Sequence, residues 1–313
     1  MATHSLGLYF NGSNLEHYLG DIMRVLLIGA SGFIGSKIIN IIPESINLTG
    51  TYCTNKISSE NVVSKQLDIL DKSLNWEEII DGYDCIIIAA RPIGFDEKSR
   101  TKVALQTYRG FSDMIDAVSN SSNPPHLVAI HGSLSYGNCG EKLISVTEKI
   151  LPTGFAKSYS VGEKPFRDYL GEGNNCAIIR APWILGPTSW YSELYLKSQQ
   201  IPILGNGRQW MSIVTLDSLA KSVWDVVLQS KQGIIHPELS YRCRQEEFAK
   251  LVAGILNKNI TKVGRLRLLR FEKQTRQSVI ASIKLDDGNS RDSESDNNRQ
   301  KILAYLKQIH SDF

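Results

Sequence analysis

The residues of this chain best suited to chemistry include three glycines, at positions 29, 32 and 35, which directly follow the apolar run at residues 25–28. Glycine at this spacing lets a strand turn tightly into a helix and lets the backbone approach a pyrophosphate closely. The following helix offers that phosphate unpaired N–H groups and the positive end of its dipole. The segment therefore predicts a dinucleotide-binding turn, whose candidate contacts are Gly29, Ser31, Gly32, Phe33, Ile34 and Gly35.

The next predicted strand, at residues 48–54, ends where such folds distinguish NAD from NADP. An acidic residue there accepts hydrogen bonds from the ribose 2′-hydroxyl and selects NAD, whereas a basic or small polar end tolerates a 2′-phosphate. This chain has Thr54, Asn55 and Lys56 and no acid. We therefore expect NADP, with NAD as the alternative because Lys56 could equally point into solvent.

A second polar group lies near the ends of later strands. Four side chains could supply a proton there: His131, Ser133, Tyr136 and Tyr159. Arg91, which directly follows Ala89 and Ala90, could hold a phosphate or carboxylate. Structural roles compete with these interpretations, because a histidine at a strand end is more often hydrogen-bonded than catalytic and an arginine on a loop is usually solvated.

These residues need a scaffold that brings strand ends together, and the order of strands and helices predicts one. Apolar or β-rich runs at 25–28, 48–54, 62–70, 83–90 and 126–131 alternate with helical patterns after 35, at 75–80 and at 102–119. Such alternation is typical of α/β proteins with a doubly wound parallel sheet, in which ligands bind beyond the carboxyl ends of the strands. We predict an extension at 1–22, a Rossmann domain over 23–180 and a smaller C-terminal substrate lobe over 181–313, whose segment 208–230 returns to the Rossmann domain.

Composition limits the possible partners. The 313 residues are 42% hydrophobic and 21% charged, which is enough to bury one large or two coupled domains. A net charge of +3 and the lack of a long apolar run favour a small-molecule substrate over nucleic acid or a membrane. Five scattered cysteines without a Cys-x-x-Cys pair predict neither a disulfide framework nor a metal site, so we expect a reducing, cytoplasmic setting.

Several short motifs occur together in a family-specific order, at 29–35, 67–71, 88–90, 133–137, 178–182 with 185–187, and 204–208 leading to 214–217. In this the chain resembles the extended short-chain dehydrogenase/reductase superfamily, which includes the NAD-dependent epimerases and dehydratases and the dTDP-4-dehydrorhamnose reductases. The resemblance implies that Asp68 and Ile69 frame the adenine, that Ala89 and Ala90 help to hold the cofactor, and that the later motifs belong to the substrate lobe. It also implies chemistry on a polar or nucleotide-sugar-like substrate, and a fold that commonly supports a homodimer.

The catalytic signature of this superfamily, Tyr-x-x-x-Lys at the start of a helix, is degenerate here. The lysine lowers the pKa of the tyrosine and holds the nicotinamide ribose. Glu148, Pro152 and Glu163 align with the residues that flank the signature, which places Phe155 at the tyrosine position and Tyr159 at the lysine position.

A rival register makes Tyr159 the catalytic tyrosine. The residue four places on is then Glu163, whose carboxylate would raise the pKa of the phenol, and Lys164 lies one place beyond the same helix face. Pro165 is expected to interrupt the helix in either case. We favour the first register.

Two neighbouring signature positions have changed as well. The serine or threonine that bonds the reacting oxygen stands four places before the Tyr-Gly pair of the superfamily, where this chain has Gly132. Ser133 takes that role if one residue is deleted. The asparagine common in the helix after the fourth strand is replaced by Thr107.

These departures leave two functions open. In the first, the chain is an NAD(P)-dependent oxidoreductase, epimerase or dehydratase whose acid–base residues have moved. In the second, it is a catalytically inactive NAD(P)-binding protein with a regulatory or partner-binding role. A general acid contributes about 10²–10⁴-fold, so its loss weakens a reductase without excluding one. We favour the enzyme.

The C-terminal part predicts structure but no function. Arg265, Arg267 and Arg270 among leucines suit a strand with a solvated basic face. The polar segment 286–298 is typical of a mobile loop, and a last short helix is expected at 299–309.

Overall fold

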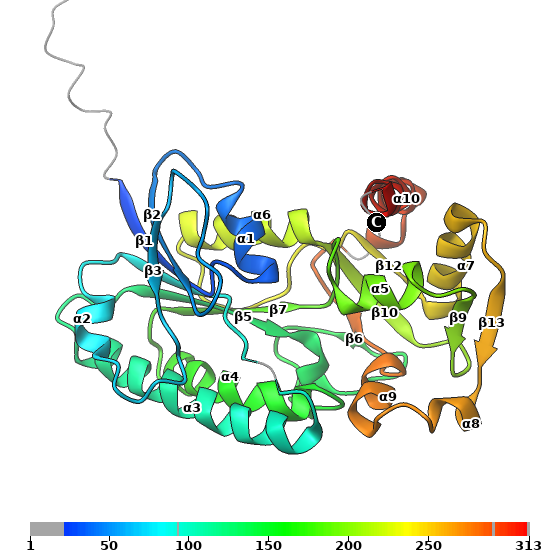
Figure 1. Ribbon diagram of the computed structural model, residues 1–313, viewed down its shortest axis with the longest axis horizontal. Helices are drawn as coiled ribbons and strands as arrows, with labels where there is room; N and C mark the ends of the chain where they lie inside the picture. Colours follow the sequence, from blue (N-terminus) through cyan, green and yellow to red (C-terminus); the bar gives the residue numbers. More distant parts are fainter. Residues whose placement is uncertain (1–21, 93, 290–291, 312–313) are drawn as a thin grey trace, which may run out of the picture.

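The computed structural model describes residues 22–92, 94–289 and 292–311, and Figure 1 shows the course of the chain through them. The predicted extension at 1–22 falls outside this range except for its last residue.

The strands are β1 (Met23–Ile28), β2 (Ile46–Tyr52), β3 (Val63–Gln66), β4 (Cys85–Ile88), β5 (His126–Gly132), β6 (Leu143–Ile144), β7 (Cys176–Ala181), β8 (Trp183–Leu185), β9 (Ile201–Leu204), β10 (Trp210–Thr215), β11 (Gly233–Ile235), β12 (Tyr241–Arg244), β13 (Ile260–Val263) and β14 (Lys284–Leu285). The α-helices are α1 (Phe33–Ile39), α2 (Trp76–Ile80), α3 (Glu97–Asn120), α4 (Ala156–Gly171), α5 (Trp190–Leu196), α6 (Leu216–Leu228), α7 (Gln245–Leu256), α8 (Arg265–Leu268), α9 (Lys273–Val279) and α10 (Asp296–Ser311). Two short 3-10 helices are η1 (Ser133–Tyr136) and η2 (Asp292–Glu294).

Seven of these strands form one parallel sheet in the order β11-β7-β5-β4-β1-β2-β3. The chain moves outward from β1 through β2 and β3, then returns to β4 and moves outward in the other direction. Ligands of such sheets bind beyond the carboxyl ends of the strands, at the point where the order reverses. The predicted Rossmann-type doubly wound sheet is confirmed, and the reversal places the candidate site beyond β1 and β4.

Helices cover both faces of the sheet because its central strands are apolar on both sides. Successive residues of a strand point to opposite faces. Val25 and Leu27 of β1 pack with α1 and α6, whereas Leu26 and Ile28 pack with α3 and α4. Figure 1 shows α1 and α6 above the sheet and α2, α3 and α4 below it.

A smaller group of elements lies at one end of this sheet, on the right of Figure 1. It contains the three-stranded sheet β12-β10-β8 and the strand pairs β13-β9 and β14-β6. Helices α5, α7 and α10 surround a core of its own, which includes Tyr191, Phe248 and Ile302. The chain thus builds the large sheet and this lobe around separate cores, while the domain boundaries given above stay a prediction.

Residues 265–271 form no strand, so that prediction is wrong. They make the short helix α8 and a continuing turn, in which the N–H of Leu269 donates to the carbonyl of Arg265. Leu268 is buried against Leu204 and Val279, whereas Leu269 is exposed. The Arg-Leu alternation has the period of a strand over 265–268, but packing of Leu268 inward selects a helical turn.

The interruption expected at Pro165 is also wrong. Helix α4 runs without a break from Ala156 to Gly171 and contains Pro165. Proline removes one backbone hydrogen bond from a helix, and the burial of Phe166 and Tyr169 on the same helix offsets that loss.

The segment 286–298 contains more structure than the predicted loop. It includes η2 and the start of α10, and Ser293 is buried. The expected last helix therefore begins at Asp296, three residues before the predicted start.

Candidate functional site

The glycine turn lies at the reversal of the strand order, between β1 and α1. Gly29 has φ +87°, and a Cβ built on it would lie 2.6 Å from the backbone nitrogen of Ala90. A Cβ on Gly35 would lie 2.2 Å from the carbonyl oxygen of Gly29. The turn is therefore packed against the end of β4 and against the first turn of α1, and only glycine fits either position.

The other residues of the predicted turn differ in exposure, because some face solvent and others pack against the protein. Ser31 and Gly32 are exposed, and a Cβ built on Gly32 would lie 3.2 Å from the Gly29 carbonyl oxygen. Ile34 packs against the core beneath the turn, and the ring of Phe33 lies against Gly186 after β8. The accessible edge of the turn is thus Ser31–Gly32, while Phe33 links the large sheet to the lobe.

The residues after β2, predicted to choose the cofactor, are exposed. Thr54, Asn55 and Lys56 all lie beyond the last residue of that strand. A cavity of about 290 Å³ lies beside β2 and β3. Thr51 lines it and also accepts a hydrogen bond of 3.1 Å from the N–H of Gly29. One residue that lines this cavity thus contacts the first glycine of the turn.

The residues expected to frame the adenine differ in exposure. Asp68 is exposed, and its carboxylate accepts a 2.9 Å hydrogen bond from the N–H of Leu70. Ile69 is buried, and its carbonyl oxygen would lie 2.2 Å from a Cβ on Gly110 of α3. The close approach of α3 fixes this loop beside the sheet.

Tyr159, an acid–base candidate on α4, reaches the end of β5. A Cβ built on Gly132 would lie 2.5 Å from the Tyr159 hydroxyl oxygen and 2.9 Å from Cζ. The phenol thus lies in the space that a serine or threonine side chain would need at position 132. The guanidinium carbon of Arg91, after β4, lies 5.5 Å from the centroid of the Tyr159 ring. Helix α4 and the ends of β4 and β5 therefore bring these three residues together.

Opposing effects act on the pKa of the Tyr159 phenol. Burial raises the pKa most. The carboxylate of Glu163, four residues further along the helix, raises it further, as expected from the sequence. The guanidinium groups of Arg91 and Arg180 and a backbone hydrogen bond from Leu134 lower it. The arginines thus supply part of the positive charge that the lysine of the superfamily signature would supply.

His131 lies on β5 beside this group but cannot serve as a cationic acid. Burial and the charges of Arg180, Arg91 and Arg167 lower the pKa of its imidazole to about 3. Its Nε2 is buried without a hydrogen-bond partner among the residues that the structure describes. The ring is therefore neutral near neutral pH.

Tyr136 and Ser133 are placed differently from Tyr159. Ser133 is buried at the start of η1. The hydroxyl of Tyr136 lies 2.7 Å from Nε2 of His236, and the guanidinium carbon of Arg180 lies 4.6 Å from the centroid of its ring. Burial raises the pKa of Tyr136 to about 12. Its hydroxyl is occupied by an internal contact with the segment after β11.

A buried ion pair joins α4 to β7 close to Tyr159. Arg180 and Glu163 are 1% and 0% exposed and form a salt bridge, and the Ser135 hydroxyl donates a 3.1 Å hydrogen bond to Glu163. The sequence motifs include both charged residues, but not their pairing. A lone arginine in the apolar strand 176–181 is the signal that a carboxylate must face it.

Phe155, the residue in the tyrosine position of the favoured register, is packed away from the strand ends. Its N–H donates a 3.0 Å hydrogen bond to the Ser278 hydroxyl on α9. Its ring lies 5.8 Å from that of Trp190, edge-on, and 5.4 Å from the guanidinium carbon of Arg100. Phe155 thus joins α4 to the lobe.

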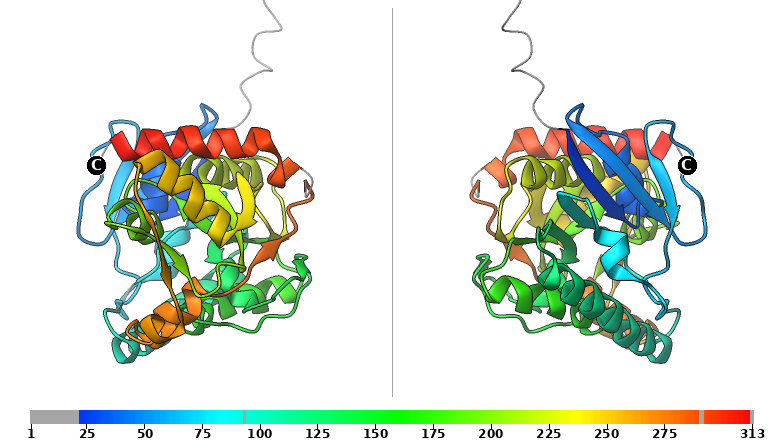
Figure 2. Two further views of the ribbon diagram at one scale, coloured as in Figure 1. Left: turned by 90° about the vertical axis from the view of Figure 1, so that its right-hand side faces the viewer. Right: turned by 90° about the vertical axis from the view of Figure 1, so that its left-hand side faces the viewer.

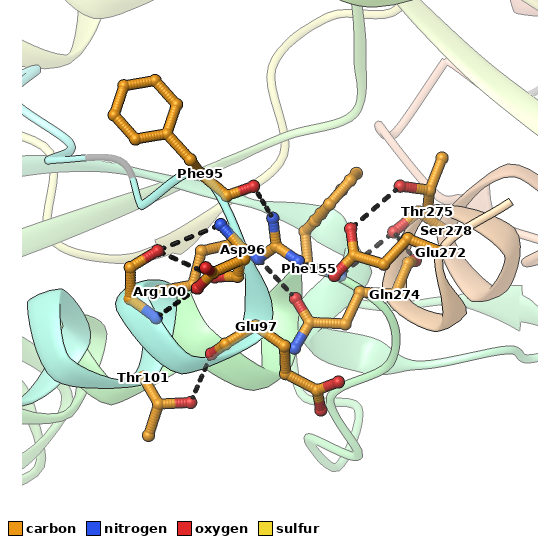
Figure 3. Close-up of polar contacts among 11 residues, drawn as sticks. Phe95, Asp96, Glu97, Arg100, Thr101, Phe155, Glu272, Gln274, Thr275 and Ser278 are labelled. Atoms are coloured by element: carbon orange, nitrogen blue, oxygen red, sulfur yellow. Dashed lines mark hydrogen bonds and ion pairs between the residues drawn. The ribbon is translucent and has the colours of Figure 1, made fainter.

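Arg100 completes this junction, as Figure 3 shows. Its Nε donates a 2.8 Å hydrogen bond to the side chain of Gln274, its Nη1 donates to the carbonyl of Phe95, and its Nη2 pairs with Glu272. Arg100 lies on α3, whereas Glu272 and Gln274 lie at the start of α9. No sequence motif predicted this contact between distant segments.

The three residues of the lobe segment 208–210 differ in exposure and in contacts. Arg208 is exposed, whereas Gln209 is buried and its side-chain amide donates to the carbonyls of Leu204 and Val279. Trp210 is half-buried, with the guanidinium carbon of Arg244 3.9 Å from its ring centroid. Lys284 Nζ lies 4.1 Å from the same centroid, so Trp210 is held by two cations at the surface of the lobe and is not a core residue.

Among the described residues, no group of three or more His, Cys, Asp and Glu side chains is placed to hold a metal ion. Nor does the described part of the chain include a helix long and apolar enough to cross a bilayer.

Comparison with known proteins places these features in a family. The model of the NAD-dependent epimerase/dehydratase family matches residues 25–238. A UDP-N-acetylglucosamine 4-epimerase from Methanobrevibacter ruminantium M1, in complex with UDP-N-acetylmuramic acid, superposes with a TM-score of 0.71 at 16% identity, over 93% of this chain and 98% of the other. A human epimerase family protein with NADPH gives 0.70 and 16%, over 93% and 100%.

A hypothetical dTDP-4-dehydrorhamnose reductase from Sulfolobus tokodaii gives a TM-score of 0.67 at 20% identity, over 87% of this chain and 95% of the other. At these identities the likeness to solved structures shows the fold alone. A search of curated proteins finds no match to the chain.

Proposed function

The chain belongs to the NAD-dependent epimerase/dehydratase family, and we propose that it is an NAD(P)-dependent enzyme that uses Tyr159 as its proton-transferring residue on a polar, nucleotide-linked substrate. The observation that carries this proposal is the position of the Tyr159 phenol against Gly132, at the carboxyl end of β5.

The glycine turn supports the binding of a dinucleotide. The Cβ positions of Gly29 and Gly35 are filled by neighbouring backbone, while Ser31 and Gly32 stay exposed at the reversal of the strand order. Such a turn accepts a pyrophosphate against its backbone. Lys56 would face a 2′-phosphate of NADP, and Asp68 and Ile69 would frame the adenine. The cofactor supplies or accepts the hydride when it is bound.

Tyr159 would move the proton that accompanies hydride transfer. The phenol Oη would donate to the substrate oxygen as a carbonyl is reduced, or accept from a hydroxyl as it is oxidised. Arg91 and Arg180 favour the phenolate form, and burial opposes it. Gly132 leaves the space that the phenol occupies, so the glycine and the tyrosine act as a pair.

A nucleotide-linked sugar is the substrate class that the family and its structural neighbours support. Solved structures with this fold include enzymes bound to UDP-N-acetylmuramic acid and to UDP-glucuronic acid. In this chain Arg91 is exposed beside Tyr159 and could bind an anionic part of such a substrate.

The test uses a panel of UDP- and dTDP-linked hexoses, with nicotinamide absorbance recording hydride transfer. Tyr159→Phe should lower turnover by about 10²–10⁴-fold and leave cofactor binding intact, because it removes the proton donor alone. Tyr169→Phe is the matched control, since Tyr169 is a buried tyrosine of the same helix that packs with the core. Undiminished turnover by Tyr159→Phe would refute the assigned role.

A catalytically inactive NAD(P)-binding protein is the second candidate, favoured by one observation. Phe155 occupies the tyrosine position of the favoured register and is held by Ser278, Trp190 and Arg100. Binding of cofactor without turnover of any substrate in the panel supports this candidate. The double substitution Phe155→Tyr with Tyr159→Lys then tests the register, because it should create hydride transfer if Phe155 stands at the former catalytic position.

A further inference from the structure

An exposed basic and apolar surface lies on the segment from Lys262 to Lys273, around helix α8. Its large apolar side chains are Leu266, Leu269 and Phe271, which are 83%, 63% and 36% exposed. Its exposed basic side chains are Lys262, Arg265, Arg267, Arg270 and Lys273. We refer to these eight residues as the α8 surface.

The backbone of α8 aims these side chains outward. The hydrogen bonds from the N–H groups of Leu268 and Leu269 to Gly264 and Arg265 make a helical turn. Leu268 points inward and packs with Leu204 and Val279. Positions three or four apart share one face of a helical turn, so Leu266 and Leu269 face away from the protein together, with the arginines at 265, 267 and 270 around them.

The contact in Figure 3 fixes this surface to helix α3, which packs on the large sheet. Glu272 pairs with Arg100 of α3, and Gln274 accepts a hydrogen bond of 2.8 Å from the same guanidinium. Glu272 is the only acidic residue between positions 262 and 273. Because Arg100 neutralises that acid, the α8 surface carries five positive charges without a compensating carboxylate of its own segment.

We propose that the α8 surface docks on an anionic lipid bilayer. Five basic side chains between positions 262 and 273 attract negatively charged headgroups, and this attraction is confined to about one Debye length from the surface. Leu266, Leu269 and Phe271, interspersed among these basic residues, add apolar area that can enter the boundary between headgroups and acyl chains. Two of the three exposed apolar side chains are leucines, which offer a nucleic acid no stacking surface, so lipid is the favoured partner.

The location of α8 suits this contact. Figure 1 places α8 and α9 at the bottom of the lobe, on the opposite side from α6 and α10, and the views in Figure 2 agree. The prediction of no membrane partner rests on the net charge of the whole chain and on the lack of a long apolar run. A peripheral contact depends on local charge instead, and the folded chain gathers that charge at α8.

Co-sedimentation of the full chain with phospholipid vesicles tests the proposal. We expect binding to vesicles of phosphatidylcholine with phosphatidylserine, no binding to phosphatidylcholine alone, and release when salt rises from about 0.1 M to about 1 M, where the Debye length falls to about 3 Å. Arg265→Gln with Arg267→Gln and Arg270→Gln should lower the partition coefficient on the order of 100-fold, since each charge contributes about fivefold. Leu266→Gln with Leu269→Gln should lower it by about tenfold or more.

The charge-matched control is Lys221→Gln with Lys231→Gln and Lys301→Gln, three exposed lysines outside the α8 surface. This variant has the same net charge as the arginine variant and should bind as the unchanged chain does. Absence of binding to the anionic vesicles would overturn the proposal, as would an equal loss in the control or full binding by the leucine variant. Circular dichroism verifies that each variant is folded, which is expected because every substituted side chain is exposed.

Discussion

A methyl group added at Gly132 should displace the phenol of Tyr159. The built Cβ lies 2.5 Å from the hydroxyl oxygen, 2.9 Å from Cζ and 3.3 Å from Cε2 of that ring, and these are its three nearest atoms. Carbon atoms in contact prefer about 3.5–4.0 Å, so the ring must move by roughly 1 Å. Overpacking of this kind costs about 1–3 kcal/mol, and we expect Gly132→Ala to lower the free energy of unfolding by that amount.

A double-mutant cycle separates this clash from other effects. In the Tyr159→Ala background the three closest atoms are gone, so Gly132→Ala should cost much less there. The coupling free energy should therefore be about 1–3 kcal/mol, measured by urea unfolding of the four proteins. Gly132 has an ordinary φ of −103°, so backbone strain does not confuse the comparison. Additivity within about 0.5 kcal/mol would refute the contact on which the role of Tyr159 depends.

Three further predictions concern other contacts. Gly35→Ala should abolish cofactor binding and destabilise the fold, because its Cβ would lie 2.2 Å from a carbonyl oxygen of the turn. In the control Gly254→Ala, in α7, the added Cβ meets open space, so urea unfolding should show the protein stabilised by about 0.5–1 kcal/mol. As pH falls from 6.5 toward 3, the unfolded chain protonates His131 before the folded chain does, so the free energy of unfolding should fall by up to about 1.4 kcal/mol per pH unit. His131→Gln should remove this contribution, and an equal dependence of the free energy of unfolding on pH in both proteins would contradict the prediction. Arg100→Ala should lower the free energy of unfolding by about 1.5–3 kcal/mol through its charged hydrogen bonds, while the exposed Arg109→Ala on the same helix should change it by less than about 0.5 kcal/mol.

The parts of the fold that sequence predicted are those specified by neighbouring residues. The turn at Gly29 and the strands before and after it follow from local pattern, since a continuous apolar run such as β4 suits only a sheet covered on both faces. The same local logic fails at 265–271, where the alternation of arginine and leucine indicates a strand and the inward packing of Leu268 determines a helix.

The candidate site depends on contacts between distant residues, which a single sequence does not specify. Tyr159 meets Gly132 only because α4 packs beside β5 at one particular rotation, and Arg180 meets Glu163 for the same reason. The contact between Arg100 and Glu272 joins positions 172 residues apart in the chain. The sequence identified Tyr159 as one of four candidates, and the fold is needed to select it.

Titration of the purified protein with NADPH and NADH, followed by nicotinamide fluorescence, tests the central claim most directly. We predict saturable binding in the micromolar range, tighter for NADPH if Lys56 faces a 2′-phosphate, and no binding to Gly35→Ala that remains folded. Failure of the folded, unchanged chain to bind either dinucleotide would contradict the claim that the Gly29–Gly35 turn is a working cofactor site.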